Sequence, residues 1–411
     1  MKITIMTPDI ERLGEIANYE SLIVNPSWHG VGKLELRINR HKLYSETLQK
    51  GNIIVVGNDT RKAFVIVHRA IELDDNGKVS ENWHIIAHAL KGVVGRRLTM
   101  PPAHTAYDSK SGSTESVMKH YVERNAVNPV DGSRKIPQLV IAPDLKRGTQ
   151  IDWQSRFKNL AEEVADISLM SGIGWDVHVD YDTQQWVFDV YEGRDLTTSQ
   201  DTLSPVIFSA TFGNIQNMSY SDSDMNFRNV AIVAGQGEGV DRRVIEVGQA
   251  SGLERYETFV DARDVSEETE DDEPVPRPLP DIIADLNNRG NQKLAEMGQE
   301  VYLEAQILTP AKNVEITRQT AFLTQFQIHE YADVKEVWAS SFVYEEDWYM
   351  GDIVTLQEND WGVTLDARIT EVTEIYEPEG FRLEAVFGQN RPTLHQKIKQ
   401  ELSGMKTEMT R

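Results

Sequence analysis

Short apolar runs, several of them alternating with polar residues, fill the first hundred positions of the chain. In KLELRI at 33–38, Leu34, Leu36 and Ile38 fall on one side of an extended chain and the charged residues fall on the other. This two-residue period is typical of a half-buried antiparallel strand. About six such runs, closed by Pro101-Pro102, predict a small β-barrel or sandwich over residues 1–102: KITIM, SLIV at 21–24, KLELRI, IIVV at 53–56, AFVIV at 63–67 and WHIIAHA at 83–89.

Helical spacing replaces this period between residues 103 and 200. Thr114 is placed to cap a helix that reaches about Val127. A longer helix is predicted at about 152–171, ended by Gly172 and Gly174, because apolar residues recur there at spacings of four and three: Trp153, Phe157, Leu160, Val164 and Ile167. Two alternating runs follow, WDVHVDY at 175–181 and QWVFDVY at 185–191. We therefore expect an α+β domain over 103–200, with helices packed on a hairpin.

Strand-like runs return over residues 201–312, which we interpret as a β-rich middle domain. The runs are VIFSATF at 206–212, NVAIVA at 229–234 and RRVIEVG at 242–248. The segment SEETEDDEPVPRPLP at 266–280 predicts a mobile, solvated loop or linker, because acids and prolines resist burial. A helix with one apolar face is expected at about 281–305: Ile283, Leu286, Leu294, Met297 and Val301.

The rest of the chain predicts a second β-barrel and a terminal helix. Residues 313–392 contain further strand-like runs, among them DIVTLQ and FRLEAVF. The limits of this barrel stay open, because a middle region can be inserted into it. Residues 393–411 form an amphipathic pattern that begins after Pro392 and indicates either a docking helix for another subunit or a frayed terminus: Leu394, Ile398, Leu402, Met405 and Met409.

The predicted fold is therefore mainly β and multi-domain, with α+β insertions, and 411 residues suffice for two to four domains. Lys and Arg total 42 against 65 Asp and Glu, and the net charge of −23 repels nucleic acid and anionic membranes. The absence of cysteine excludes disulfides, thiolate zinc sites and a cysteine nucleophile. Apolar runs of a few residues are far shorter than the ~20 needed to span a bilayer, so no membrane contact is expected.

The stretch AGQGEGVDR at 234–242 raises the question of nucleotide binding, because Gly235, Gly237 and Gly239 follow an apolar run. A dinucleotide site needs the glycine turn to open a helix. Here the turn leads into VDRRVIEV, which is typical of a strand. The pattern therefore predicts a hairpin tip, with room for a partner contact at the three glycines, and no nucleotide cofactor.

Other candidate sites are weaker. The stretch WDVHVDYD places four potential metal ligands at alternate positions of one strand: Asp176, His178, Asp180 and Asp182. A single strand cannot surround a metal ion without ligands from other elements. We therefore expect a solvated face and assign no metal. No G-x-S-x-G elbow and no H-E-x-x-H pair occurs. A glycoside hydrolase that acts on cell wall or capsule through a pair of carboxylates stays an alternative function. Such a pair cannot be picked out among 65 Asp and Glu residues. No catalytic residue is named, and an assembly protein is favoured over an enzyme.

Three stretches together resemble the tail hub proteins of long-tailed phages. They are IAHALKGVVGRRLTMPP at 86–102, the segment from NVAIVAGQGEGVDRRVIEVG to FVDARDV at 229–265, and GDIVTLQ with ARITEVTEIYEPEGFRLEAVFGQNRPTL at 351–394. The central stretch is the most specific. The chain is similar to a siphovirus tail or baseplate hub family, including the hub part of tail-associated lysins and the hub of contractile-tailed phages.

The resemblance implies a structural virion protein of the tail tip, made in the bacterial cytoplasm. In that family three copies form a ring, and two related barrels from each copy continue the hexameric tail tube. The implied partners are a distal tail or tail tube protein, a tape measure protein, and a fibre, spike or lysin. DNA would pass through the lumen without specific binding, which suits the negative charge. The lysins continue into a wall-cleaving domain, whereas only Thr393–Arg411 follow the last barrel here.

Overall fold

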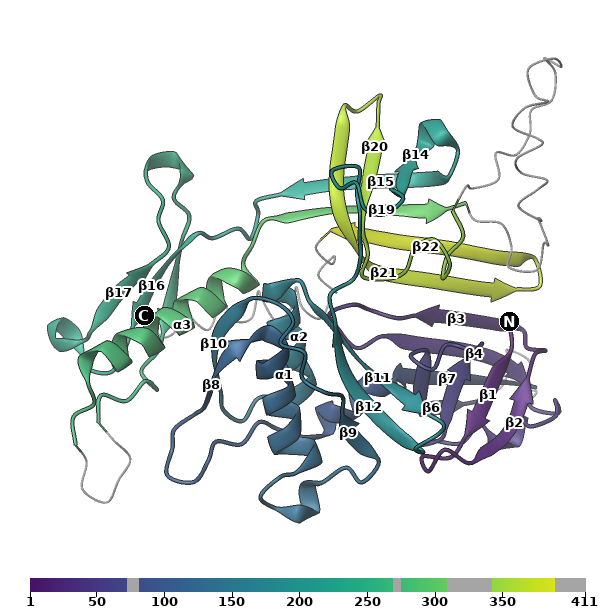
Figure 1. Ribbon diagram of the computed structural model, residues 1–411, viewed down its shortest axis with the longest axis horizontal. Helices are drawn as coiled ribbons and strands as arrows, with labels where there is room; N and C mark the ends of the chain where they lie inside the picture. Colours follow the sequence, from purple (N-terminus) through teal and green to yellow (C-terminus); the bar gives the residue numbers. More distant parts are fainter. Residues whose placement is uncertain (72–80, 269–274, 309–341, 389–411) are drawn as a thin grey trace.

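The computed structural model describes residues 1–71, 81–268, 275–308 and 342–388 (Figure 1). The terminal helix expected over 393–411 lies outside the described residues. The described chain is mainly β and divides among several sheets, with two α+β regions.

The first ninety residues form seven antiparallel strands. All six predicted runs form strands. RLGEI forms a seventh strand, which was not predicted because its glycine interrupts the apolar pattern. Leu34, Leu36 and Ile38 are fully buried while Lys33 and Arg37 are exposed, which confirms the alternation. A short 3-10 turn, η1 (Ser45–Thr47), precedes β5. The strands are β1 (Ile3–Met6), β2 (Arg12–Ile16), β3 (Ser21–Asn25), β4 (Lys33–Asn39), β5 (Ile53–Val56), β6 (Ala63–Ala70) and β7 (Asn82–Ala89).

An α+β region follows, and its two helices differ from the predicted ones at their starts. Helix α1 (Thr114–Val122) is capped by Ser113, whose hydroxyl accepts from the Ser116 N–H at 3.2 Å, so Thr114 is the first helical residue and not the cap. The helix continues as the π-turn η3 (Glu123–Val127), which matches the predicted end. Helix α2 covers only Leu160–Ser171.

Residues 152–155, expected at the start of the second helix, instead belong to strand β10 (Gln150–Ser155), which pairs with β8 (Asp108–Ser113). Trp153 therefore reaches the core from a strand, and Phe157 is half exposed. Asn159 starts the helix, because its side-chain oxygen accepts from the N–H groups of Ala161 and Glu162 in the first turn. The helical spacing of the apolar residues was therefore accidental at its first two positions, Trp153 and Phe157. Pairing with a strand distant in sequence decided the structure there.

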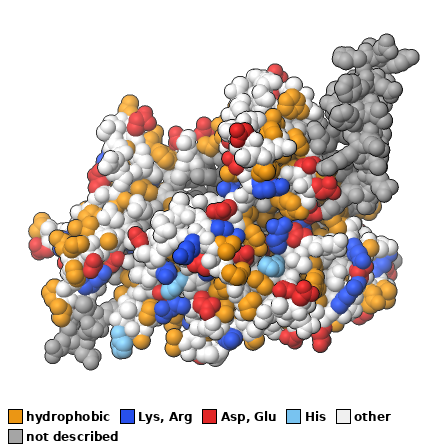
Figure 2. All heavy atoms as spheres, in the orientation of Figure 1, with side chains coloured by type: hydrophobic (Ala, Val, Ile, Leu, Met, Phe, Trp, Pro, Cys, Tyr) orange, Lys and Arg blue, Asp and Glu red, His pale blue; other side chains and the backbone are white. Residues whose placement is uncertain are grey.

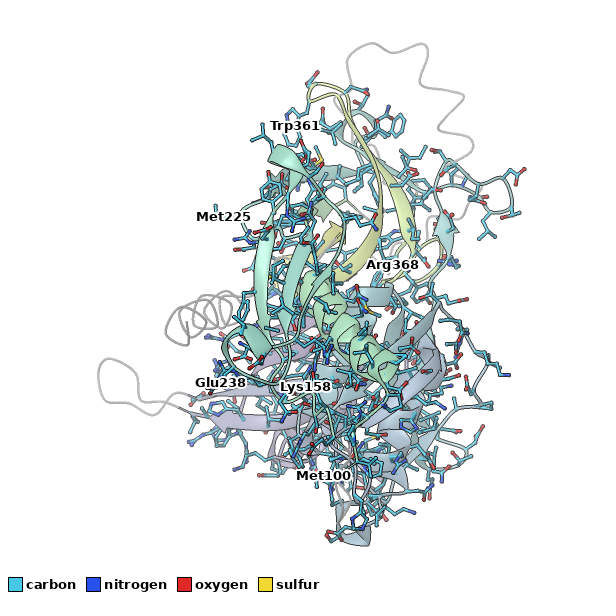
Figure 3. All side chains as sticks on the ribbon, turned by 90° about the vertical axis from the view of Figure 1, so that its left-hand side faces the viewer. Met100, Lys158, Met225, Glu238, Trp361 and Arg368 are labelled. Atoms are coloured by element: carbon cyan, nitrogen blue, oxygen red, sulfur yellow. The ribbon has the colours of Figure 1, made fainter. Side chains whose placement is uncertain are left out.

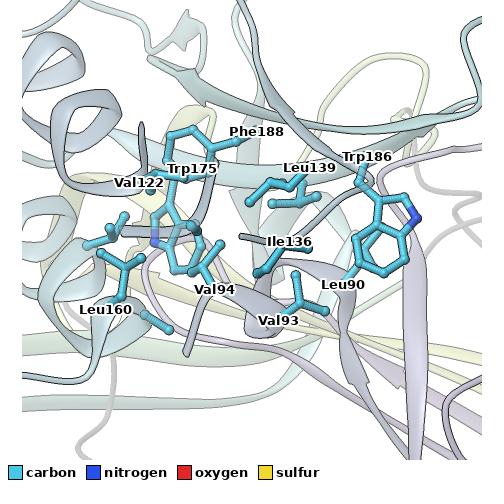
Figure 4. Close-up of a cluster of buried hydrophobic side chains, with 14 of the residues drawn as sticks. Leu90, Val93, Val94, Val122, Ile136, Leu139, Leu160, Trp175, Trp186 and Phe188 are labelled. Atoms are coloured by element: carbon cyan, nitrogen blue, oxygen red, sulfur yellow. The ribbon is translucent and has the colours of Figure 1, made fainter. Parts of the chain in front are cut away.

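The predicted hairpin is confirmed as β11 (Gly174–Asp180) and β12 (Gln185–Tyr191), and β9 (Leu139–Ile141) pairs in parallel with β12. Gly172 ends α2 in the left-handed conformation, as expected. Between β7 and β9 lie the 3-10 helices η2 (Leu90–Arg96) and η4 (Gly132–Arg134). The helices, hairpin and η2 enclose one apolar core (Figure 4), whose labelled members are Leu90, Val93, Val94, Val122, Ile136, Leu139, Leu160, Trp175, Trp186 and Phe188.

Strands from two separate stretches build the C-terminal half of the main sheet. Strand β15 pairs with β19, β19 with β22, and β22 with β21. Strand β21 also pairs with β3, so one antiparallel path runs from β15 to β2 across both halves (Figure 1). Strand β20 pairs with β21, β13 and β14. The elements are β13 (Asp195–Leu196), β14 (Ile207–Ser209), η5 (Ala210–Phe212), β15 (Ile215–Ser223), β19 (Glu300–Ile307), β20 (Ile353–Glu358), β21 (Val363–Glu377) and β22 (Gly380–Gly388).

A small α+β unit is inserted between β15 and β19. It contains β16 (Val230–Ala234), η6 (Gly239–Asp241), β17 (Val244–Val247), η7 (Gly252–Glu254), β18 (Glu257–Asp261) and helix α3 (Leu279–Glu296). The helix ends nine residues before the predicted limit of 305, because residues from Glu300 onward pair with β15 and β22 as β19. Val301 is thus a strand residue, and Ile282 with Leu286 forms the buried face.

The mainly β class with α+β insertions is confirmed. Closure of each half into a barrel, and the domain limits themselves, stay predictions. Within the described residues, no helix is long and apolar enough to cross a bilayer.

Candidate assembly surface

The main sheet presents one solvent-facing surface that crosses from its C-terminal half to its N-terminal half. Glu304 lies opposite Val386, which in turn lies opposite Glu371. The side chains of Thr373 and Asn25 are joined across the β21–β3 junction by a hydrogen bond of 2.6 Å. We call this surface the outer face, and its polar members include Gln306, Glu304, Glu384, Arg382, Glu371, Thr373, Asn25, Ser21, Lys33, Glu35, Arg37, His84 and His88.

The charge of the outer face differs between its halves. Glu304, Glu371 and Glu384 outnumber the exposed Arg382 on the C-terminal half, whereas Lys33 and Arg37 lie on the N-terminal half. Burial, followed by repulsion from Glu304, raises the pKa of Glu371 to about 6. One carboxyl on the acidic half is therefore partly protonated near neutral pH.

On the N-terminal half of the outer face, the pKa of the carboxylate of Glu35 is shifted in the opposite direction. Lys33 donates to Glu35 at 3.1 Å, and His84 lies 3.8 Å away. The hydrogen bond from Lys33 is the main cause that lowers the pKa of Glu35. This carboxylate stays charged, and the N-terminal half of the outer face is mixed in sign with an excess of cationic and histidine side chains.

The loop between β3 and β4 holds the two halves and the α+β region together through Trp28. Its backbone N–H donates to the Thr370 carbonyl at 2.8 Å, and its indole N–H donates to the Gly172 carbonyl at 3.0 Å. The ring lies so close to Gly174 and Gly351 that a Cβ at either position would overlap it. Trp28 is 6% exposed. Three regions of the fold therefore meet on one side chain.

Buried charges reinforce this junction. Lys62, in the turn before β6, forms ion pairs with Glu345 and Glu374 of the C-terminal half. Tyr376 donates to the second Glu374 oxygen at 2.6 Å. Burial opposes the charged amine, but the neighbouring acidic groups raise the pKa of Lys62 overall.

An arginine adds a further link between the C-terminal half and the chain leaving β12. Arg194 forms a forked contact with the buried Asp352, at 2.6 Å for the shortest pair. We call Trp28, Lys62, Glu345, Glu374, Arg194 and Asp352 the seam. Sequence reasoning missed all six, because isolated charges in ordinary runs carry no signal of long-range pairing.

The glycine stretch is a hairpin tip, as predicted. Strands β16 and β17 are antiparallel, and Gly237 and Gly239 take positive φ values of 104° and 57°, whereas Gly235 does not. The turn continues into a three-residue 3-10 turn and then β17, so the helix that a pyrophosphate site requires does not follow. Val240 at the tip is fully exposed. A partner contact at this tip stays a prediction.

Apolar side chains gather beside this tip, over β17 and α3 at the left of Figure 2. On the same face, acidic and basic side chains are interspersed. The candidate docking helix with Leu394, Ile398, Leu402 and Met405 lies outside the described residues.

The expectation of a solvated face for WDVHVDYD is wrong for its first member. Asp176 is half-buried near Lys91, and burial raises its pKa to about 6. Lys91, 2% exposed, donates to the Ser27 and Trp175 carbonyls at 2.6 and 3.0 Å, and burial lowers its pKa to about 8. Asp180 instead caps the hairpin turn by accepting from the Asp182 N–H at 2.9 Å. Other elements that pack over the strand shield its first acid from part of the solvent.

A protein-family model described as Siphovirus ReqiPepy6 Gp37-like protein matches residues 2–389 of the chain. Among curated proteins, none matches the sequence.

Solved tail proteins are similar in fold at low sequence identity. The 43 kDa tail protein of prophage MuSo2 from Shewanella oneidensis has a TM-score of 0.50 and 10% identity, covering 95% of this chain and 98% of its own. Prophage tail protein gp18 from Listeria monocytogenes EGD-e has a TM-score of 0.49 and 10% identity, covering 99% and 100%. The tail protein from Neisseria meningitidis MC58 has a TM-score of 0.47 and 14% identity, covering 94% and 95%. The first likeness shows a shared fold.

Proposed function

The chain belongs to the siphovirus family of ReqiPepy6 Gp37-like proteins, and on this premise we propose that it is a structural hub of the phage tail tip. Three copies form a ring, and each copy contributes its two sheet halves as neighbouring units of a six-unit tube. The ring anchors the tail tube or distal tail protein, with the tape measure protein, on one side. On the other side it anchors a fibre, spike or lysin.

The continuity of the main sheet carries this proposal. Backbone hydrogen bonds between β21 and β3 join the two halves into one antiparallel surface, and Trp28 fixes their relative position. A tube wall needs such a surface, because units joined only by loops would leave gaps at each junction. The same backbone pairing, repeated between copies at the terminal strands β2 and β15, would close a ring.

The outer face suits the lumen of this tube. Its acidic half, with Glu304, Glu371 and Glu384, repels DNA phosphates. Its other half carries Lys33 and Arg37, so we infer a lumen with alternating acidic and mixed sectors rather than a uniformly acidic one. A short basic sector would slow the passing DNA less than a continuous basic lining, because the strength of DNA binding grows with the number of phosphates contacted.

Negative-stain electron microscopy of the purified protein, with sedimentation velocity on the same sample, tests the ring. We expect three-fold particles with an open centre and a six-lobed rim. Monomers that stay single at high concentration and in the presence of the tail tube protein would contradict the proposal.

The glycoside hydrolase alternative needs an acid with a raised pKa beside a second carboxylate in a cleft. Glu371 has such a pKa, but its main cause is burial among the strands of the main sheet. A peptidoglycan-release assay on the purified chain tests the hydrolase alternative directly.

A further inference from the structure

A groove of about 300 Å³ on the α+β region gathers three arginines in a strongly acidic protein. It lies where η2 ends and η4 packs against it, and its lining consists of Arg96, Arg97, Leu98, Met100, Ser133 and Arg134. We call it the arginine groove. Met100 marks its position, at the opposite end of the molecule from Trp361 (Figure 3).

Backbone carbonyls hold two of the three guanidinium groups in place. Arg97 donates to the carbonyls of Arg134 and Arg96, the second at 3.0 Å. Arg134 donates to the Leu98 carbonyl at 2.5 Å. Each guanidinium has five N–H donors, so these bonds fix the groups and leave further donors that find no protein acceptor among the described residues.

No carboxylate among the described residues forms an ion pair with these arginines, although Asp131 lies near enough to Arg134 to oppose part of the lowering of its pKa. Within the described ranges, none of the three lies within 4.0 Å of a carboxylate, whereas Arg147, Arg194 and Arg277 each form such a pair. Burial and then the nearby Arg97 lower the pKa of Arg134, which shows two cations held close together. An anion placed between them would relieve this repulsion.

The rim of the groove is apolar, because Leu98 and Met100 are 47% and 40% exposed. Arginine forks match carboxylates in a two-point geometry, and an apolar rim selects a ligand that carries aliphatic groups beside its charges. Duplex DNA fits less well: it presents a charge about every 1.7 Å and would meet the repulsion of the whole acidic chain, whereas a short segment carries few charges.

We propose that the arginine groove binds a short acidic segment of a partner protein, in which Asp or Glu side chains alternate with aliphatic ones. The carboxylates pair with Arg96, Arg97 and Arg134, and the aliphatic groups cover Leu98 and Met100. The site does not depend on ring formation, since all its residues belong to one copy of the chain.

Fluorescence anisotropy of the full chain with a short labelled peptide of Asp, Glu and Leu tests the site. Arg96→Glu is the main variant, because the Arg96 side chain is exposed and bonds to nothing among the described residues. We expect it to weaken binding roughly tenfold or more. Arg40→Glu, an exposed arginine of the N-terminal half, is the matched control and should leave binding unchanged.

Two further measurements test whether charge carries the affinity of the peptide for the arginine groove. A peptide with Asn and Gln in place of the acids should bind at least roughly tenfold more weakly, and added salt should weaken the acidic peptide, since charge carries the affinity. The proposal is overturned if the amide peptide binds equally well, if both arginine variants lose the same affinity, or if no peptide binds. Tighter binding of a single-stranded oligonucleotide than of the peptide would assign the groove to nucleic acid instead.

Discussion

The seam and the outer face of the main sheet both carry charged residues, under opposite conditions. At the seam, Lys62 and Glu374 are buried and paired across the two halves. On the outer face, Lys33 and Glu384 are exposed to solvent. Charges at the seam therefore determine whether the halves stay together, while charges on the outer face determine what the assembled surface repels or tolerates.

Removing the seam cation should have the largest effect. Lys62→Met leaves two carboxylates facing each other in the interior, and we expect the free energy of unfolding to fall by about 3–5 kcal/mol. Urea unfolding followed by tryptophan fluorescence measures it. Lys33→Met, the matched change on the outer face, should cost less than about 0.5 kcal/mol. Equal losses in the two variants would mean that the seam pair does not hold the halves together.

The packing of Trp28 should come next. Gly351→Ala places a methyl group against the Trp28 ring and forces alanine into a φ of +96°, so we expect a loss of about 3 kcal/mol. Gly362→Ala has a similar positive φ of +65° with no atom within 4 Å of the new Cβ. This control isolates backbone strain and should cost about 1 kcal/mol, measured by thermal unfolding. A Gly351 variant no less stable than this control would contradict the close contact with Trp28.

The outer face should show a smaller, pH-dependent effect at Glu371. The pKa of Glu371 in the folded protein, about 6, lies above the ordinary value of 4.5. The native state therefore binds this proton more tightly than the unfolded state does. As the pH rises from 4.5 to 6 the proton is lost, and the free energy of unfolding falls. At about pH 7.5, Glu371→Gln should raise the free energy of unfolding by about 2 kcal/mol, and at about pH 4 it should change little.

Urea midpoints at the two pH values provide the measurement for Glu371. Glu384→Gln, on the same half but exposed, should show no such difference between the two pH values. A Glu371→Gln effect of the same size at both pH values would show that lost packing, and not charge, is responsible.

The sequence predicted the elements whose signal is local. Alternation in KLELRI gave a strand with the correct buried face, and the glycine spacing with a following strand gave the hairpin tip at Gly235–Gly239. Predictions failed where a segment pairs with strands distant in sequence. Residues 152–155 pair with β8, and residues 300–305 pair with β15 and β22, although both stretches were predicted to be helical.

By itself, the sequence determined the mainly β class, the net charge of −23 and the family resemblance, because each follows from composition or from short patterns along the chain. Only the tertiary structure decided that β21 pairs with β3, that Lys62 reaches Glu374, and that Arg97 and Arg134 share a groove. The two residues of each contact are 37 to several hundred positions apart, and the contacts exist only once backbone pairing and core burial have brought their strands and turns together.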